Sequence, residues 1–104
     1  MSEKLNRYET VYIVRPTLDD EAVDRVVAAV DEFIKTNGGI VDATDKKGRR
    51  RLAYEVKKMR DGFYVQTNFR IKPAAVAGIK RMMAISEDII REIVVVDEEQ
   101  PVTV

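Results

Sequence analysis

Residues 46–54 read Lys-Lys-Gly-Arg-Arg-Arg-Leu-Ala-Tyr, and this stretch joins a dense basic run to the pattern of a β-strand. Five positive charges flank Gly48, after which Leu52, Tyr54 and Val56 fall on one face of an extended chain. Cations that are fixed on a strand form a dense positive patch, and the commonest partner of such a patch is a phosphate backbone. The alternative is a solvated surface run without a partner, as most charge clusters are.

The segments on the N-terminal side of this stretch predict a strand followed by a helix. Residues 8–14 are rich in β-branched and aromatic side chains and end before Pro16. Thr17 or Asp19 can cap a helix, along which apolar side chains recur at spacings of three and four. Asn37-Gly38-Gly39 ends that pattern. We therefore expect an amphipathic helix that packs against a sheet.

The basic stretch itself lies in a long strand, and the elements after it alternate in type. Ile40 to Val56 predicts one interrupted strand, with a bulge or bend at Gly48. Arg60-Asp61-Gly62 predicts a turn, and residues 63–71 predict a third strand. A second helix is expected to start at Pro73, and residues 89–96 predict the last strand.

This order, β-α-β-β-α-β, predicts an α+β protein of the ferredoxin-like class. Two helices should cover one face of a four-stranded antiparallel sheet, with strands one and three in the centre and strands two and four at the edges. The length of 104 residues suits a single domain, which we place at 1–97 and which leaves a short acidic tail at 98–104.

Alternation along the two central strands predicts which side chains lie on the uncovered face of the sheet. In strand three the apolar set is odd-numbered, so Tyr64, Gln66, Asn68 and Arg70 should point away from the helices. If Tyr8 and Tyr12 of strand one point inward, Val11 and Ile13 lie beside Tyr64 and form a small apolar centre with a polar rim. That pattern is typical of a protein interface. The alternative is a flipped first strand in which Val11 and Ile13 are core residues.

Composition and charge exclude several classes of function. The chain has 18 basic and 18 acidic residues, but its net charge is −5 over residues 1–45, +9 over 46–91 and −4 over 92–104. Binding to an anion would therefore be oriented and confined to one patch. The absence of cysteine and histidine removes thiol chemistry and the commonest general base and metal ligand. No apolar run reaches 18 residues and no signal core is visible, so we expect a cytoplasmic protein.

The chain resembles the bacterial small-subunit (30S) ribosomal protein S-six family over about residues 7–96. The most specific match is Gly48-Arg49-Arg50-Arg51-Leu52-Ala53-Tyr54, and the outer matches are Arg7-Tyr8-Glu9, Pro16, Gly62-Phe63-Tyr64-Val65 and Ile89-Ile90-Arg91-Glu92-Ile93-Val94-Val95. One departure is Glu55, where the family pattern has proline.

The resemblance implies a structural component of the small ribosomal subunit, without turnover and without a cofactor. Such a protein binds the central domain of the small-subunit ribosomal RNA as a heterodimer with ribosomal protein S-eighteen, which meets the open sheet face. The candidate RNA-binding residues are Lys46, Lys47, Arg49, Arg50, Arg51, Lys57 and Lys58. The candidate partner-protein residues are Val11, Ile13, Tyr64, Gln66, Asn68 and Arg91.

Two other classes share the topology. An acylphosphatase-like enzyme needs an anion-binding loop after the first strand, but here Arg15 is followed closely by Asp19 and Asp20, which makes a poor phosphate cradle. A small-molecule regulatory domain of the ACT type usually has glycine at the first strand–helix turn, where this chain has Pro16. Both rest on fold analogy alone.

Overall fold

The computed structural model describes residues 5–96, so the tail expected at 98–104 lies outside the described residues. The elements along the chain are β1 (Asn6–Val14), α1 (Asp20–Thr36), β2 (Ile40–Val56), β3 (Met59–Ile71), a short 3₁₀ turn (Pro73–Ala75), α2 (Val76–Ile85) and β4 (Ile89–Val96). The predicted β-α-β-β-α-β order is confirmed, and the second helix begins with a 3₁₀ turn at Pro73 before it becomes α-helical. No helix within residues 5–96 is both long enough and apolar enough to span a membrane.

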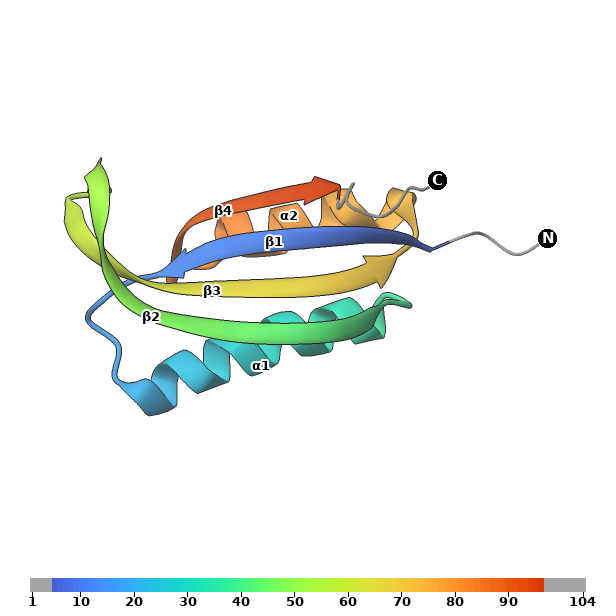
Figure 1. Ribbon diagram of the computed structural model, residues 1–104, viewed down its shortest axis with the longest axis horizontal. Coiled ribbons are helices and arrows are strands. Elements are labelled where there is room, and N and C mark those ends of the chain that lie inside the picture. The colour runs from blue at the N-terminus through green and yellow to red at the C-terminus, as the bar shows by residue number, and fades with distance from the viewer. Residues whose placement is uncertain (1–4, 97–104) are drawn as a thin grey trace, which may run out of the picture.

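The four strands form one sheet in the order β2-β3-β1-β4, and every neighbouring pair is antiparallel. The predicted centre and edges are therefore correct. Both helices cover the same face, and within residues 5–96 no other helix or strand covers most of the other face (Figure 1).

Helix α1 begins where the sequence predicts. The Asp19 carboxylate accepts a hydrogen bond from the Ala22 backbone N–H at 2.9 Å, which satisfies one of the N–H groups left unpaired in the first turn. The helix buries four apolar side chains, Val23, Val27, Val30 and Ile34. Valine is a poor helix former, so burial of this stripe, rather than intrinsic propensity, stabilises the helix.

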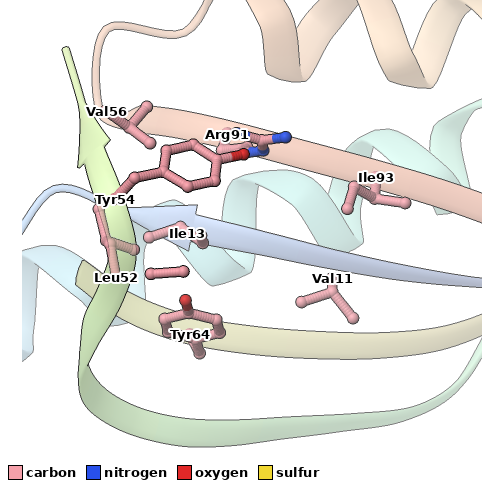
Figure 2. Close-up of a pocket in the computed structure, with 9 residues that line it drawn as sticks. Val11, Ile13, Leu52, Tyr54, Val56, Tyr64, Arg91 and Ile93 are labelled. Atoms are coloured by element: carbon pink, nitrogen blue, oxygen red, sulfur yellow. The ribbon is translucent and has the colours of Figure 1, made fainter. Parts of the chain in front are cut away.

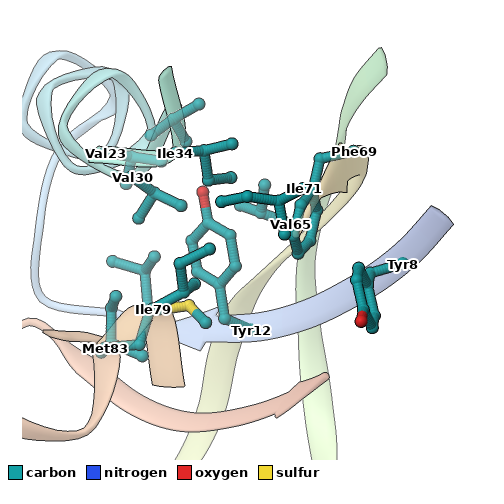
Figure 3. Packing of buried hydrophobic residues seen from close by; sticks show 13 residues of the cluster. Tyr8, Tyr12, Val23, Val30, Ile34, Val65, Phe69, Ile71, Ile79 and Met83 are labelled. Carbon is teal, nitrogen blue, oxygen red and sulfur yellow. The ribbon is translucent and has the colours of Figure 1, made fainter. Parts of the chain in front are cut away.

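The main core lies between the helices and the sheet (Figure 3). The two inward-facing tyrosines of β1, Tyr8 and Tyr12, are buried there, and Tyr8 stacks on Phe69 of β3 with ring centroids 5.7 Å apart. Ile79 and Met83 of α2 are fully buried against them. The Tyr12 hydroxyl points toward α1, and burial raises its pKa above the ordinary tyrosine value. The inward faces predicted for strands one and three are thus confirmed.

Gly48 sits at a β-bulge, as the sequence predicts. The pairing of β2 with β3 changes register between Lys46, opposite Val65, and Gly48, opposite Tyr64. The φ angle of Gly48 is 96°, a left-handed conformation that glycine adopts without a Cβ clash. The bulge inserts one residue into β2 and so decides which face Arg49, Arg50 and Arg51 take, before the pairing changes register again between Arg51 and Val56.

The turn predicted at Arg60-Asp61-Gly62 is wrong. The chain reverses at Lys57 and Lys58, whose φ angles are 51° and 67°, and β3 already begins at Met59. Two adjacent residues with positive φ are the mark of a tight primed hairpin turn. Gly62 belongs instead to the strand, where a Cβ would lie 2.2 Å from Cγ2 of Ile13. This glycine therefore serves a close packing contact and not a turn.

Strands β2 and β3 continue beyond the end of β1. Val14, the last residue of β1, lies opposite Phe63, so residues 50–62 have no β1 neighbour and form a two-stranded arm. Figure 1 shows this arm curling away from the other strands at the left of the view. Two-stranded ribbons twist more strongly than wide sheets, which accounts for the curl. The arm bends over the open face.

Candidate interaction surface

The arm gives the open face a small apolar cluster of its own. Ile13 of β1, Leu52 of the arm and Ile90 of β4 bury one another there. Only 7% of Ile13 is exposed, so the expectation that it forms part of an exposed patch is wrong, although the face predicted for it is correct. The physical reason is the bend of the arm, which brings Leu52 over a side chain that would otherwise face water.

Next to this cluster lies a groove of about 240 Å³ on the open face (Figure 2). The residues that line it are Val11, Ile13, Leu52, Ala53, Tyr54, Val56, Tyr64, Arg91 and Ile93. It contains four of the six predicted partner-protein residues. The rim carries large exposed apolar side chains, since Tyr54 is 60% and Ile93 is 50% exposed. Exposed apolar surface of this kind is costly in water.

Two arginines lie over the tyrosines of the open face. The guanidinium carbon of Arg91 is 5.5 Å from the centroid of the Tyr54 ring, and that of Arg50 is 5.8 Å from the centroid of the Tyr64 ring. Both distances suit a cation–π contact, which leaves the guanidinium N–H groups open to other acceptors. Arg50 therefore belongs to the groove side of the arm, together with Leu52 and Tyr54.

The polar residues predicted on the open face lie farther along the central strands. Gln66 donates a hydrogen bond to the Asn68 side-chain oxygen at 3.2 Å. Arg70 makes an ion pair with Asp42 of β2, with a shortest N–O distance of 2.7 Å, and this contact raises the pKa of Arg70. Gln66 and Asn68 do not line the groove, although Gln66 lies directly opposite Val11, which does.

Alternation along β2 divides the basic run between two faces. Lys46 is paired with Asp24 of α1, and Lys47 is paired with Asp45. Arg49 points to the helix side, where it donates hydrogen bonds to the backbone oxygens of Pro16 at 2.6 Å and Leu18 at 3.1 Å. These three cations are therefore held by groups of the protein itself.

The remaining predicted RNA-binding residues lie on the arm. Lys57 and Lys58 form its turn, and both are exposed. Arg51 is exposed on the side of β2 opposite to Arg50. The structure thus does not bring the basic run together as one patch; it places the accessible cations at the arm.

Sequence reasoning did not select four residues that the structure places at these surfaces. Leu52, Tyr54 and Ile93 line the groove, and Arg60 lies on the arm close to Arg51. The alternation of Leu52, Tyr54 and Val56 was a usable signal for a shared face, but only the bend of the arm shows that this face meets β1 and β4.

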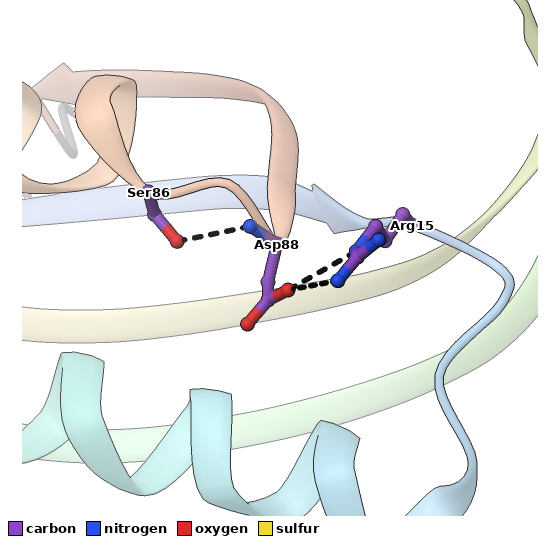
Figure 4. A network of polar contacts seen from close by, with 3 residues as sticks. All are labelled: Arg15, Ser86 and Asp88. Atoms are coloured by element: carbon purple, nitrogen blue, oxygen red, sulfur yellow. Dashed lines mark hydrogen bonds and ion pairs between the residues drawn. The ribbon is translucent and has the colours of Figure 1, made fainter.

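The arginine that an acylphosphatase-like site would need is engaged elsewhere. Both Nε and Nη2 of Arg15 donate hydrogen bonds to Oδ1 of Asp88, at 3.0 and 2.7 Å (Figure 4). The Asp88 backbone N–H in turn donates to the Ser86 hydroxyl at 3.3 Å. This network ties the end of β1 to the start of β4 and leaves the loop after β1 without a preformed phosphate cradle.

The fold and the two surfaces define a ferredoxin-like interaction module, in which one sheet face carries the core and the other presents a groove and a cationic arm. Residues 7–96 match the family model described as ribosomal protein S6. The chain therefore belongs to the ribosomal protein S6 family of the small ribosomal subunit, a family of ribosomal proteins and not of enzymes.

Individual relatives agree with this membership. The chain is 42% identical over 95 residues to small ribosomal subunit protein bS6 of Exiguobacterium sibiricum, which covers 91% of this chain and 100% of the relative. It is 44% identical over 96 residues to the protein of the same name from Heliobacterium modesticaldum, covering 92% and 100%. A crystal structure of 30S ribosomal protein S6 from Thermotoga maritima superposes with a TM-score of 0.83 at 27% identity, over 88% of this chain and 86% of that one.

Proposed function

We propose that this chain binds the central domain of the small-subunit ribosomal RNA together with ribosomal protein S-eighteen, and that S-eighteen covers the open-face groove. The observation that carries the proposal is the groove itself. Its rim exposes Tyr54, which is 60% exposed, and Ile93, which is 50% exposed, and Val95 farther along β4 is 49% exposed outside the groove. An interface that buries apolar anchors within a polar rim has this composition.

The RNA part of the proposal rests on the distribution of charge. The arm, residues 50–62, holds five basic and two acidic residues, a net charge of +3, and lies in the positive part of the chain, so RNA would approach from the arm. Lys57 and Lys58 are exposed at its tip, and Arg50 keeps N–H groups available above Tyr64. Lys46, Lys47 and Arg49 have partners within the protein, so we assign them a smaller share of phosphate contact.

The groove is tested with two isoleucine-to-aspartate variants that differ only in position. Ile93→Asp places a charge on the groove rim, and Ile85→Asp places the same charge on α2, where Ile85 is 75% exposed and away from the groove. Calorimetric titration with purified S-eighteen should show affinity at least about tenfold weaker for Ile93→Asp and near-parental affinity for Ile85→Asp. Parental affinity in the Ile93 variant would exclude the groove as the S-eighteen site.

RNA binding is measured separately, with the central-domain fragment in the presence and absence of S-eighteen. The proposal predicts tighter binding when the partner is present, because the two proteins then share the RNA surface. An affinity that does not respond to S-eighteen would contradict joint binding.

A further inference from the structure

The cations of the arm differ in how much of their hydrogen-bonding capacity is already used. Arg50 and Arg91 stack on tyrosines, and Arg49 is bound to two backbone oxygens. By contrast, the side chains of Arg51 and Arg60 make no hydrogen bond, ion pair or ring contact within residues 5–96. Both are exposed. Two guanidinium groups therefore remain fully available on this part of the molecule.

These two arginines come from different strands and line the same hollow. Arg51 belongs to β2 and Arg60 to β3, next to the point between Arg51 and Val56 where the pairing of the two strands changes register. Together with residues 52–55 they surround a shallow space of about 330 Å³. Because both residues line this space, both guanidinium groups can reach one group bound in it.

We propose that Arg51 and Arg60 clamp one phosphate group of the RNA backbone. Guanidinium groups are planar forks that match the oxygens of a phosphate, and two of them can neutralise a single anion from two sides. Lys57 and Lys58 at the turn add positive charge nearby, which favours a polyanion over an isolated carboxylate. This clamp rests on the proposed RNA-binding function and names the residues and the chemical group through which the arm acts.

Glu55 gives the clamp a specific signature. It lines the same hollow as the two arginines. Its carboxylate repels a phosphate, so the clamp predicts that Glu55→Gln raises RNA affinity. A hollow that bound a cationic group would show the opposite response.

The main experiment compares two double variants that each remove two positive charges. Arg51→Gln/Arg60→Gln removes the clamp, and Lys80→Gln/Arg81→Gln removes two exposed cations of α2. Affinity for the central-domain RNA fragment is measured by filter binding over a range of salt, with S-eighteen present. The clamp variant should lose affinity and lower the salt-dependence slope by roughly one unit, the value for one phosphate, while the α2 variant keeps the parental slope. Equal losses in the two variants would overturn the clamp.

Single variants separate one shared phosphate from two independent contacts. If both arginines hold the same group, Arg51→Gln and Arg60→Gln each lose most of the affinity lost by the double variant. Losses that simply add, or an unchanged double variant, would overturn the clamp while leaving RNA binding in place. A double variant that keeps RNA affinity but loses S-eighteen would assign the hollow to a carboxylate of the partner. If the parent itself fails to bind RNA, the proposed function fails, and the clamp fails with it.

Discussion

The ring of Tyr54 and the guanidinium group of Arg91 lie 5.5 Å apart, although they belong to strands at opposite edges of the sheet. Strands β3 and β1 lie between these edges, so the contact exists only because the arm bends over the open face. Leu52 of β2 and Ile90 of β4 likewise pack in one apolar cluster and so link the same two edge strands. The open face is therefore partly closed by the protein's own hairpin.

The Tyr54–Arg91 contact should be energetically coupled. We expect a double-mutant cycle with Tyr54→Ala and Arg91→Ala to give a coupling free energy of about 0.5–1 kcal/mol, the usual value for an exposed cation–π pair. Urea denaturation of the parent, both single variants and the double variant provides the measurement. Strictly additive single effects would show that the two side chains are neighbours without attraction.

Gly62 should be intolerant of a methyl group, because the added Cβ would lie 2.2 Å from Cγ2 of the buried Ile13. We expect Gly62→Ala to lower the free energy of unfolding by about 1–3 kcal/mol through overpacking. Gly78→Ala is the matched control, because Gly78 lies in α2 with no atom within 4 Å of the added Cβ. The free energy of unfolding of the control should rise by about 0.5–1 kcal/mol, because alanine has a higher helix propensity than glycine. In chemical denaturation the free energy of unfolding should therefore fall for Gly62→Ala and rise for Gly78→Ala. A Gly62→Ala variant as stable as the parent would contradict the contact.

Arg49 should contribute to stability more than to RNA binding. Its guanidinium group donates to the backbone oxygens of Pro16 and Leu18 and so fastens β2 to the loop before α1. We expect Arg49→Ala to lower the free energy of unfolding by about 0.5–1 kcal/mol in thermal or chemical unfolding, because both hydrogen bonds are exposed to solvent. The salt dependence of RNA binding should stay near the parental value. A slope lowered by about one unit with unchanged stability would identify Arg49 as a phosphate ligand instead.

Asp31 should destabilise the protein slightly at neutral pH. Burial beneath β2 raises the pKa of its carboxyl group above the ordinary value, although the Thr44 hydroxyl donates to it at 3.3 Å and Lys35 attracts its charge. The folded state then binds a proton more readily than the unfolded state, so stability from this group falls as pH rises between the unfolded and folded pKa values.

Asp31→Asn removes this charge and tests whether the charge lowers the stability of the fold. The variant should be more stable than the parent at pH 7 by less than about 1 kcal/mol, since the group is only partly buried. Below the ordinary aspartate pKa of about 3.9 the advantage should disappear, because both chains are then neutral at this position. Urea melts at the two pH values measure the difference; a variant that is weaker at pH 7 would show that the charge is favourable in the fold.

The faces of β1 and β3 could be predicted because they follow from local patterns, and the sheet order could be predicted because the order of the elements is that of a known class of fold. Alternation with a period of two decides the face of Tyr12 or Tyr64 within the strand itself. The burial of Ile13 could not be predicted in this way, because it depends on Leu52 and Ile90, which are distant in sequence. Strand parity identifies a face and does not show what bends over it.

The hairpin turn and the division of the basic run have equally physical explanations. Lys57 and Lys58 lack the Asn-Gly or Asp-Gly sequence that usually marks a primed turn. Asp61-Gly62 has such a sequence, although it lies within β3. Neighbouring arginines look like one patch in the sequence, but adjacent positions on a strand point in opposite directions. Arg49 therefore meets the loop before α1 while Arg50 meets Tyr64.

The bulge at Gly48 sets the direction of the side chains where the arm begins. Arg49, Arg50 and Arg51 take their faces from that one extra residue, because a shift by one position exchanges the two faces of a strand, and the pairing changes register again only between Arg51 and Val56. Deletion of Gly48 would turn Arg50 away from Tyr64 and bring Arg49 and Arg51 over the open face. A single glycine without a side chain thus decides which of these positive charges the open face presents.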